Sequence, residues 1–364
     1  MGRRPPGNFG SIMTFEFGIF HEFSRGSGQT DKEAFTQSLD QVDGAERWGI
    51  DVIWLAELHF LPKRSVLSAP LVVASAIAAR TRRMKIGIGV QVLPLCHPLR
   101  LAEEVATLDH ISGGRLIFGV GRSGFPRTYE AYGVPYAQSR ERFTEVLEIL
   151  RRAWSNERFS FEGDFYTFRD IPLVPRPLQH PYPSLRVAAT SPDTYPAIGA
   201  MGLPIFVAVR LGTLEELGPN IAAYREAYRL AGHPGQGEVY LRVPIYVGET
   251  EASARADPEQ SIMEFYRTLG QQVEESATRA GARAIEQRSE RGQMLQTISY
   301  ADALRDKVIV GTPESATARL QDLVNKLGLN GILAELNCGG LITHDKVMRS
   351  LQLMCEEVAP RLRM

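Results

Sequence analysis

The alternation of short apolar runs with helix-prone segments is the feature that most restricts how this chain can fold. Eight runs of strand character recur along the 364 residues, and helical segments separate them. Such alternation favours parallel strands joined by crossover helices. The count predicts a (β/α)8 TIM barrel, with an open doubly wound sheet as the alternative. The predicted strands are 14–20, 51–56, 84–90, 115–120, 185–189, 204–209, 239–247 and 331–336.

Helical spacing of apolar residues fills most of the connections between these strands. A hairpin is predicted at 159–168, turning at Gly163 and Asp164. Residues 249–307 interrupt the alternation of strands and helices. They form a long, charged, helix-prone excursion after the seventh strand. We expect residues 1–13 to be a disordered extension and 14–364 to form one barrel domain. The predicted helices are 31–48, 67–80, 99–111, 138–154, 192–201, 213–231, 313–327 and 343–358.

Composition points away from several kinds of partner. The formal net charge is −1, without the bias expected of a protein that binds nucleic acid or a membrane surface. No apolar run reaches the roughly 20 residues of a membrane span, and no apolar stretch follows the charged start to make a signal peptide. The three scattered cysteines form no metal-binding spacing and fit a reducing cytoplasm. We therefore expect a cytoplasmic protein with neither nucleic acid nor membrane as a partner.

The segment 84–122 contains two strand ends where a ligand is expected. Its first strand ends at Gly89 and Val90, and a helix follows until Ser112-Gly113-Gly114. A second strand then delivers Arg122 to its carboxyl end. In parallel α/β folds ligands gather at this end of the strands.

Arg122 lies inside a GxGxxG pattern, residues 119–124, which resembles a dinucleotide fingerprint. A Rossmann loop of that type must open directly into a helix, and the next predicted helix begins only near Gln138. The pattern therefore does not favour a dinucleotide site. The Arg122 guanidinium can instead hold a phosphate through two hydrogen bonds, the alternative being a surface arginine paired with a carboxylate.

Ser191 and Thr194 follow the fifth predicted strand and open a helix. Ser191 is a good N-cap and Pro192 suits the first turn. A helix start rich in hydroxyls can bind an anion, although an ordinary capped helix has the same pattern. Because Arg122 follows the neighbouring fourth strand, the three side chains form a candidate phosphate site.

His59 and Glu57 end the second predicted strand. His59 is a candidate for proton transfer near neutral pH, with Glu57 orienting it or balancing its charge. The alternative is a histidine with a structural role. The sequence lacks HExxH, GxxxxGK[ST] and GxSxG, so zinc proteolysis, P-loop phosphoryl transfer and α/β-hydrolase chemistry have no support.

Three stretches together resemble the bacterial luciferase-like family of flavin-dependent monooxygenases. They are WLAELHF at 54–60, VLPLCHPLRLAEEVATLDHISGGRLIFGVGR at 92–122 and VAATSPDT at 187–194. The resemblance extends over nearly the whole chain from about Thr14. It implies a (β/α)8 barrel that binds FMN at the strand ends, a mobile lid in the excursion, and a homodimer.

The resemblance also implies roles for individual residues. Arg122, Ser191 and Thr194 would contact the FMN phosphate, and Thr190 would lie near the flavin. The Gly89–Val90 peptide would be a non-prolyl cis bond beside the isoalloxazine ring. Glu103 would lie close to the active site.

Two positions depart from the luciferase pattern. Leu58 replaces the first of two adjacent histidines, the one tied to catalysis in luciferase, so His59 is the remaining candidate for proton transfer. Thr190 replaces a glutamate, which removes a negative charge near the flavin and alters its electronic surroundings. Both departures argue against light emission from a long-chain aldehyde.

The sequence thus predicts an FMNH2-dependent monooxygenase that acts on a small organic substrate with molecular oxygen. A separate flavin reductase would supply reduced FMN, since no nicotinamide motif is present. A deazaflavin-dependent oxidoreductase and a non-catalytic flavin-binding protein are the alternatives. The candidates for the pocket wall are Phe125, Tyr129, Tyr132 and Arg210.

Overall fold

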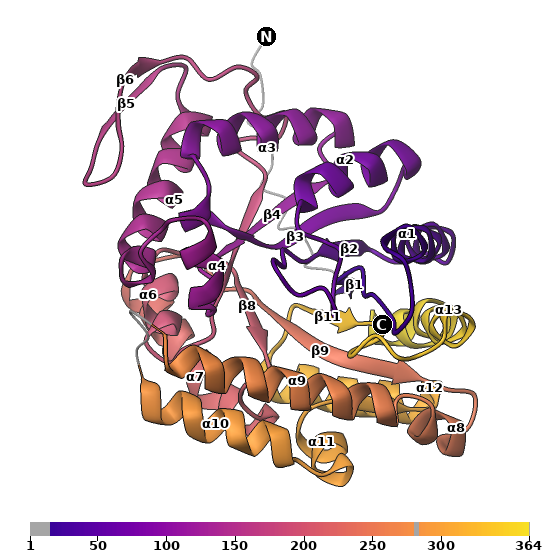
Figure 1. The fold of residues 1–364 in the computed structure, drawn as a ribbon. Coiled ribbons are helices and arrows are strands. Elements are labelled where there is room, and N and C mark those ends of the chain that lie inside the picture. Colours follow the sequence, from indigo (N-terminus) through magenta and orange to yellow (C-terminus); the bar gives the residue numbers. More distant parts are fainter. Residues whose placement is uncertain (1–14, 280–283, 364) are drawn as a thin grey trace.

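A closed ring of parallel strands wrapped by helices forms the body of the computed structural model, which describes residues 15–279 and 284–363 (Figure 1). The strand order is β10-β9-β11-β1-β2-β3-β4-β7-β8, and β8 also pairs with β9. This last pairing closes the ring, so the predicted (β/α)8 barrel is confirmed and the open sheet is wrong. The predicted extension at 1–13 lies outside the described residues.

The eight barrel strands lie within a few residues of their predicted positions. The short strand β10 (Ile309–Gly311), which pairs along β9, was not predicted, because three residues are too few to show a period. The barrel strands are β1 (Glu16–His21), β2 (Val52–Leu55), β3 (Lys85–Val92), β4 (Leu116–Gly121), β7 (Ser184–Ala188), β8 (Ile205–Ala208), β9 (Val239–Val247) and β11 (Gly331–Glu335).

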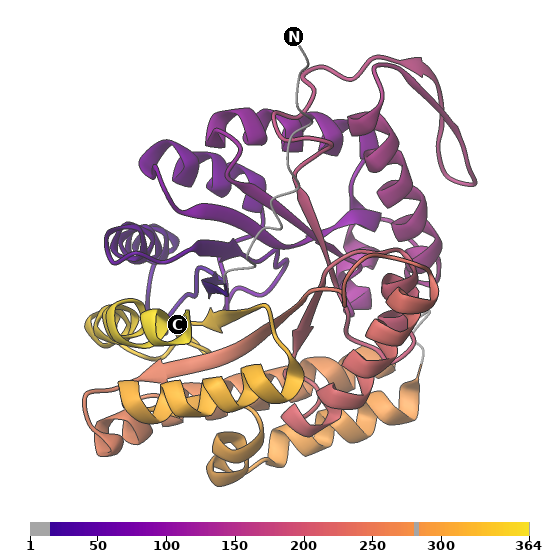
Figure 2. The same cartoon turned by 180° about the vertical axis from the view of Figure 1, so that it is seen from behind.

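Helices cover the outside of the barrel, as Figures 1 and 2 show from opposite sides. The predicted hairpin is present as β5 (Phe159–Glu162) and β6 (Thr167–Ile171), which pair antiparallel. A short π-helical stretch, Met354–Val358, and α14 (Ala359–Leu362) complete the C-terminal helix. The outer helices are α1 (Asp31–Arg47), α2 (Pro70–Arg80), α3 (Pro98–Ser112), α5 (Ser139–Ser155), α6 (Thr194–Ala200), α7 (Leu214–Leu230), α12 (Pro313–Leu327) and α13 (His344–Leu353).

The end of α3 determines where β4 begins. Pro98 occupies the first turn, where its missing N–H costs no hydrogen bond. Gly113 ends the helix with φ 65°, a left-handed conformation that glycine adopts without steric cost. The chain then turns directly into β4, and Arg122 emerges at its carboxyl end.

The excursion between β9 and β10 is helical, as predicted. Its helices are α8 (Glu251–Ala256), α9 (Glu259–Ala277), α10 (Ile285–Thr297) and α11 (Tyr300–Asp306). In Figures 1 and 2, α9 and α10 lie side by side along one side of the barrel. They have an apolar cluster of their own, formed by residues that include Ile262, Phe265, Tyr266, Leu269, Val273 and Leu295.

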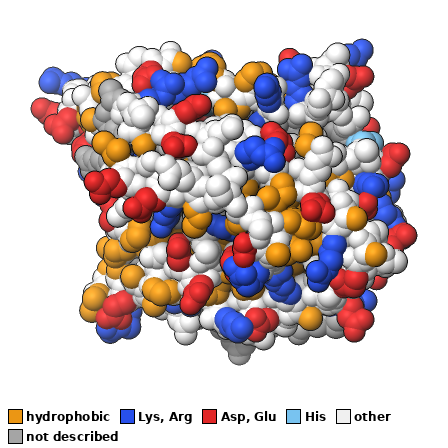
Figure 3. All heavy atoms as spheres, turned by 60° about the horizontal axis from the view of Figure 1, so that its bottom comes forward, with side chains coloured by type: hydrophobic (Ala, Val, Ile, Leu, Met, Phe, Trp, Pro, Cys, Tyr) orange, Lys and Arg blue, Asp and Glu red, His pale blue; other side chains and the backbone are white. Residues whose placement is uncertain are grey.

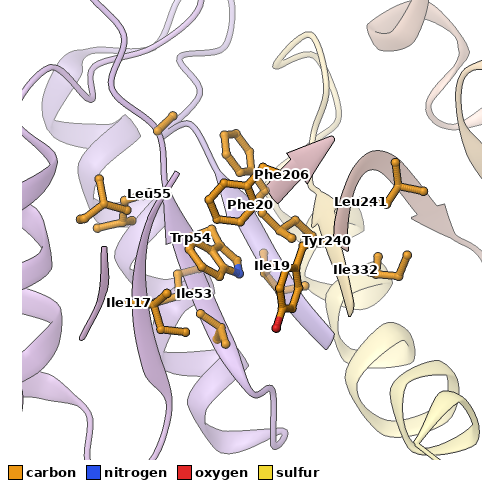
Figure 4. Packing of buried hydrophobic residues seen from close by; sticks show 14 of the residues in the cluster. Ile19, Phe20, Ile53, Trp54, Leu55, Ile117, Phe206, Tyr240, Leu241 and Ile332 are labelled. Atoms are coloured by element: carbon orange, nitrogen blue, oxygen red, sulfur yellow. The ribbon is translucent and has the colours of Figure 1, made fainter. Parts of the chain in front are cut away.

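Trp54 fills the centre of the barrel below its mouth, next to Phe20, Phe206 and Tyr240 (Figure 4). Its ring centroid lies 4.9 Å from that of Phe206 in an edge-to-face arrangement. The neighbouring strands contribute glycines, because a Cβ at Gly87 would lie 2.1 Å from the indole and one at Gly18 would lie 2.7 Å from it.

A buried ion pair lies near the N-terminal end of the barrel. Arg186 Nη1 donates to Glu16 Oε1 at 2.7 Å, and the guanidinium carbon lies 3.5 Å from the Tyr240 ring centroid. The interior is therefore filled with side chains, as in other TIM barrels. Space for a ligand remains at the carboxyl ends of the strands.

Within the described ranges, no helix combines the length and apolar character needed to cross a membrane. The face in Figure 3 carries Lys and Arg side chains interspersed with Asp and Glu, without a broad region of one sign.

Candidate active site

A cavity opens at the carboxyl ends of β2, β3 and β4, with α9 along its other side. Its volume is about 640 Å³, counting the open mouth. Strand ends thus supply one wall and the excursion supplies the facing wall. The lining residues are Glu57, Leu58, His59, Phe60, Leu61, Val92, Ser123, Phe125, Pro126, Arg127, Thr128, Gln272, Glu275, Ser276 and Arg279.

Glu57 and His59 form a hydrogen-bonded pair in this cavity. Glu57 Oε1 lies 2.7 Å from His59 Nε2, and the two side chains are only 4% and 8% exposed. Glu57 Oε2 accepts hydrogen bonds from Gln91 Nε2 and the Val92 backbone N–H, both at 2.7 Å. Four bonded partners would be needed to saturate the carboxylate, and three already fix its orientation. The carboxylate can therefore hold the His59 ring in place.

The carboxylate also selects a tautomer of His59. Because Glu57 is an acceptor, Nε2 is assigned the proton and Nδ1 is left as the acceptor nitrogen. Nδ1 lies 3.3 Å from Tyr132 Oη. The ring therefore presents a basic nitrogen beside a phenol at the cavity.

The Gly89–Val90 peptide is cis, as the resemblance implied. A Cβ at Gly89 would lie 3.3 Å from the Phe20 ring, so little room exists there for a larger residue. A Cβ at Gly121 on the next strand would lie 2.5 Å from Val90 Cγ2, so glycine is required for the close approach of Val90. Gly89 and Val90 are both half-buried.

Arg122 is a half-buried cation at the end of β4. Its backbone carbonyl accepts a hydrogen bond from Tyr129 Oη. No carboxylate of residues 15–279 or 284–363 forms an ion pair with its guanidinium. The alternative of a surface arginine paired with a carboxylate is therefore wrong for the described part of the chain.

Ser191 and Thr194 lie close together after β7. Ser191 Oγ is 2.7 Å from Thr194 Oγ1. Val120 of β4 pairs with Val187 of β7, so Arg122 and Ser191 follow neighbouring strands at the same end of the barrel. The structure thus brings a cation and two hydroxyls to adjacent strand ends.

The predicted start of α6 is wrong. The helix begins at Thr194, Asp193 is its N-cap, and the Ser191 carbonyl accepts from the Thr194 N–H at 2.8 Å across a turn. Pro192 and Asp193 form this turn instead of the first helical residues. Hydrogen bonds from Ser191 and Arg140 lower the pKa of Asp193, so its negative charge is compensated.

Other predicted residues lie apart from this group. Glu103 is on the outward face of α3, half-exposed, with Arg100 Nη1 3.7 Å away, and it does not line the cavity. Thr190 is exposed at the end of β7. Phe125 lines the cavity as predicted, whereas Tyr129 is fully buried and neither Tyr132 nor Arg210 is among the residues that line it.

A short helix after the GxGxxG pattern was also missed. Helix α4 (Pro126–Ala131) begins two residues beyond Gly124, whereas no helix was expected before Gln138. Its six residues are too few to show an apolar period. The closed barrel still argues against a Rossmann site, because that site needs the crevice of an open sheet.

Two glutamines in the site were not predicted. Gln91 donates to Glu57, and its Oε1 atom is buried without a hydrogen-bond partner. Gln272 of α9 lines the cavity, and its Oε1 atom is likewise unpartnered. The position of Gln91 near the carboxyl end of a strand could have identified it as a site residue. No sequence pattern indicated that Gln272 would line the cavity.

Two curated relatives match most of the chain at 27% identity, and a third matches less than half of it at 35%. A limonene 1,2-monooxygenase of Rhodococcus erythropolis is 27% identical over 336 residues, 90% of this chain and 81% of that protein. The oxygenase component of a flavin-dependent trigonelline monooxygenase from Acinetobacter baylyi is 27% identical over 70% of this chain and 71% of its own length. An F420-dependent glucose-6-phosphate dehydrogenase of Kineococcus radiotolerans is 35% identical over 43% of this chain and 48% of its own.

A solved structure confirms the fold. The oxygenating constituent of 3,6-diketocamphane monooxygenase from Pseudomonas putida, solved with FMN, superposes with a TM-score of 0.79. That match covers 95% of this chain and 98% of the other at 20% identity. The model of the luciferase-like monooxygenase family matches residues 14–331. The chain therefore belongs to the luciferase-like monooxygenase family.

Proposed function

We propose that this chain is an oxygenase that uses reduced FMN, supplied by a separate reductase, to oxygenate a small organic substrate. The observation that carries the proposal is that the Arg122 guanidinium, without an ion pair among the described residues, and the Ser191 and Thr194 hydroxyls follow neighbouring strands at one end of the barrel. The Glu57–His59 pair provides an acid/base group in the adjacent cavity. The trigonelline relative, named as an oxygenase component, supports a separate reductase.

The residues present fit a flavin phosphate. A half-buried arginine without a carboxylate partner in the described part of the chain is suited to an anion, and two neighbouring hydroxyls supply further donors. The space around Gly124 is open, since an added Cβ there would meet nothing within 4 Å. Arg122, Ser191 and Thr194 would hold the phosphate.

The isoalloxazine ring would lie against the Gly89–Val90 peptide, where glycine leaves the backbone uncovered, with Thr190 near its edge. Reduced FMN, when bound, supplies the electrons that activate molecular oxygen. The protein contributes orientation and exclusion of water, because α9 covers the cavity opposite the strand ends.

His59 would move the proton. Nδ1 is its acceptor nitrogen, and the hydrogen bond between Nε2–H and Glu57 orients the ring. Leu58, which replaces the luciferase histidine, lines the same cavity and cannot accept a proton. Proton transfer is therefore assigned to His59 alone at this strand end.

The test mixes the protein with photoreduced FMN without oxygen, then adds oxygenated buffer and follows flavin reoxidation by stopped-flow absorbance. We expect tight binding of reduced FMN and reoxidation kinetics that differ from those of the free flavin. Identical kinetics with and without protein would contradict oxygenase function.

The F420-dependent relative supports a second candidate, a deazaflavin-dependent oxidoreductase. FMN and F420 both carry a phosphate that Arg122 could bind. The affinities of the chain for the two cofactors therefore distinguish the two candidate functions. Binding of F420 at least tenfold tighter than FMN would favour this candidate. Retention of oxidised flavin through gel filtration, without any effect on reoxidation, would favour a non-catalytic flavin-binding protein.

Family resemblance also supports a homodimer in the cytoplasm. Light scattering on the purified chain tests the dimer, which would have twice the chain mass of 40.4 kDa.

A further inference from the structure

A second group of charged side chains lies at the mouth of the barrel. We call it the Arg210 cluster, and it consists of Glu22 after β1, Arg64 before α2, Arg210 after β8, Arg242 in β9 and Glu335 at the end of β11. Closure of the barrel brings these distant positions together.

Four members of the Arg210 cluster neutralise one another. Arg64 donates to both oxygens of Glu22, at 2.7 and 2.5 Å. Arg242 bridges the two carboxylates, with Nη2 2.7 Å from Glu22 Oε1 and Nε 2.9 Å from Glu335 Oε2. Although burial alone would raise the pKa of Glu22, the Arg64 and Arg242 guanidiniums hold it well below its ordinary range. Both carboxylates are thus engaged.

Arg210 is left without a partner of this kind. Its Nε and Nη2 atoms are out of contact with solvent and have no hydrogen-bond partner. No ion pair among the described residues involves its guanidinium. The Phe265 ring of α9 lies 5.8 Å away but offers no acceptor. The Arg210 cluster therefore carries one uncompensated positive charge.

Neither nearby weak acid removes this charge. Burial raises the pKa of the Tyr266 phenol and of the Cys338 thiol well above their ordinary values, so both stay neutral. Burial, with Arg64 and Arg242 nearby, lowers the pKa of Arg210 to about 9, which still leaves it protonated at neutral pH. A half-buried cation whose Nε and Nη2 atoms lack partners is costly without a counter-charge, and a bound anion relieves that cost.

The position of α9 connects Arg210 to the cavity. Phe265, beside Arg210, and Gln272, which lines the cavity, are separated by two helical turns and so share one face of α9. Seven residues of helix span about 10 Å, so the cavity end and the Arg210 end of this face are separated by about the length of a small organic molecule. Tyr266 Oη, also buried without a partner and near Arg210, provides a further donor.

We propose that Arg210 holds a carboxylate of the substrate, and that this chain therefore acts on small organic acids. The inference names the substrate class for the proposed oxygenase and rests on that function. Anion binding itself is measured without flavin, so the two ideas fail separately.

The experiment titrates the purified flavin-free chain with benzoate and acetate by isothermal calorimetry in low-chloride buffer. Benzamide and acetamide serve as uncharged isosteres. We expect saturable binding of at least one carboxylate and affinity at least tenfold lower for its amide. Absence of carboxylate binding, or equal binding of carboxylate and amide, would overturn the proposal.

Variants of Arg210 test whether the carboxylate binds at this residue. Arg210→Gln should weaken carboxylate binding at least tenfold, and Arg210→Lys should restore part of it. Arg267→Gln is the matched control, because it removes an α9 arginine that pairs with Glu264 on the surface. Unchanged affinity in Arg210→Gln, with folding checked by circular dichroism, would overturn the assignment.

A competition arm distinguishes a substrate carboxylate from the cofactor phosphate. The same titration is repeated with the chain saturated with FMN. Retained benzoate affinity supports a substrate subsite, whereas displacement of benzoate in proportion to FMN occupancy would assign the anion site to the cofactor. Failure of FMN to bind at all contradicts the proposed function and leaves the flavin-free titration to decide the role of Arg210.

Discussion

The Glu57 carboxylate accepts a hydrogen bond from His59 Nε2 at 2.7 Å while its other oxygen is held by Gln91 and the Val92 N–H. The His59 ring thus has one nitrogen fixed by a carboxylate that cannot easily rotate. Its Nδ1 atom is left to face Tyr132. This arrangement is what an acid/base histidine requires, and it makes the assignment testable.

Replacement of His59 by Gln should lower the oxygenation rate by roughly 10²–10⁴-fold, because general acid/base groups contribute about that much. The dissociation constant of reduced FMN should stay within about twofold, since His59 is not proposed to hold the flavin. Stopped-flow kinetics and fluorescence titration measure the two quantities. His110→Gln, which removes a surface ring bonded to the Arg176 carbonyl, is the control. An equal loss in both variants would contradict the role of His59.

Replacement of Arg122 by Gln should weaken FMN binding by roughly 10–100-fold, because a charge-assisted hydrogen bond contributes about 1.5–3 kcal/mol. Riboflavin, which lacks the phosphate, should bind the variant and the parent equally. Quenching of flavin fluorescence gives both constants. Arg152→Gln removes a surface arginine paired with Glu148 and should change neither. Equal weakening of FMN and riboflavin would show that Arg122 does not contact the phosphate.

Stability should fall as the pH drops from 6.5 towards 4 because of His21. Burial lowers its pKa to about 4, and its ring accepts from the Phe23 N–H through Nδ1 and contacts Gln41 through Nε2. Between these pH values the unfolded chain binds a proton that the folded chain does not, so the free energy of unfolding decreases by up to about 3 kcal/mol.

Urea unfolding of the parent and of His21→Gln at pH 7, 6 and 5 checks this prediction. The glutamine can make both hydrogen bonds without titrating, so its free energy of unfolding should depend less on pH. A lowest pH of 5 stays above the ordinary pKa of about 4 of a carboxyl group, so few carboxylates are protonated. His110→Gln should keep the slope of the parent, and a parent slope unchanged by His21→Gln would refute the role of His21.

Gly87→Ala should destabilise the fold by about 1–3 kcal/mol or more, because overpacking forces neighbouring groups to shift. The added methyl would lie 2.1 Å from the Trp54 ring, which has no space to move within the barrel. Gly218→Ala in α7 is the control, since its methyl would meet nothing within 4 Å. Thermal unfolding measures both.

A double-mutant cycle tests whether contact with Trp54 causes the loss of stability in Gly87→Ala. Trp54→Leu removes the indole, so adding Gly87→Ala to that variant should cost much less than it costs the parent. Strict additivity of the two changes would mean that the contact with Trp54 is not the source of the strain.

The sequence by itself determined the order of the strands and helices, because periods of two and 3.6 residues are local properties. It also placed Glu57 and His59 at one strand end, and its family resemblance implied the cis Gly89–Val90 peptide that the structure contains. It missed β10 and α4, which are too short to show a period, and it started α6 too early at Pro192.

Only the tertiary structure decided which charges meet. Arg210 was a candidate for the pocket wall, but no pattern linked it to Arg64, Arg242, Glu22 and Glu335, which are separated by up to hundreds of positions in the chain. Closure of the barrel brings these residues to one mouth, and burial there decides that four are paired while Arg210 is not. Proximity and desolvation are properties of the folded chain, so no local pattern could have predicted them.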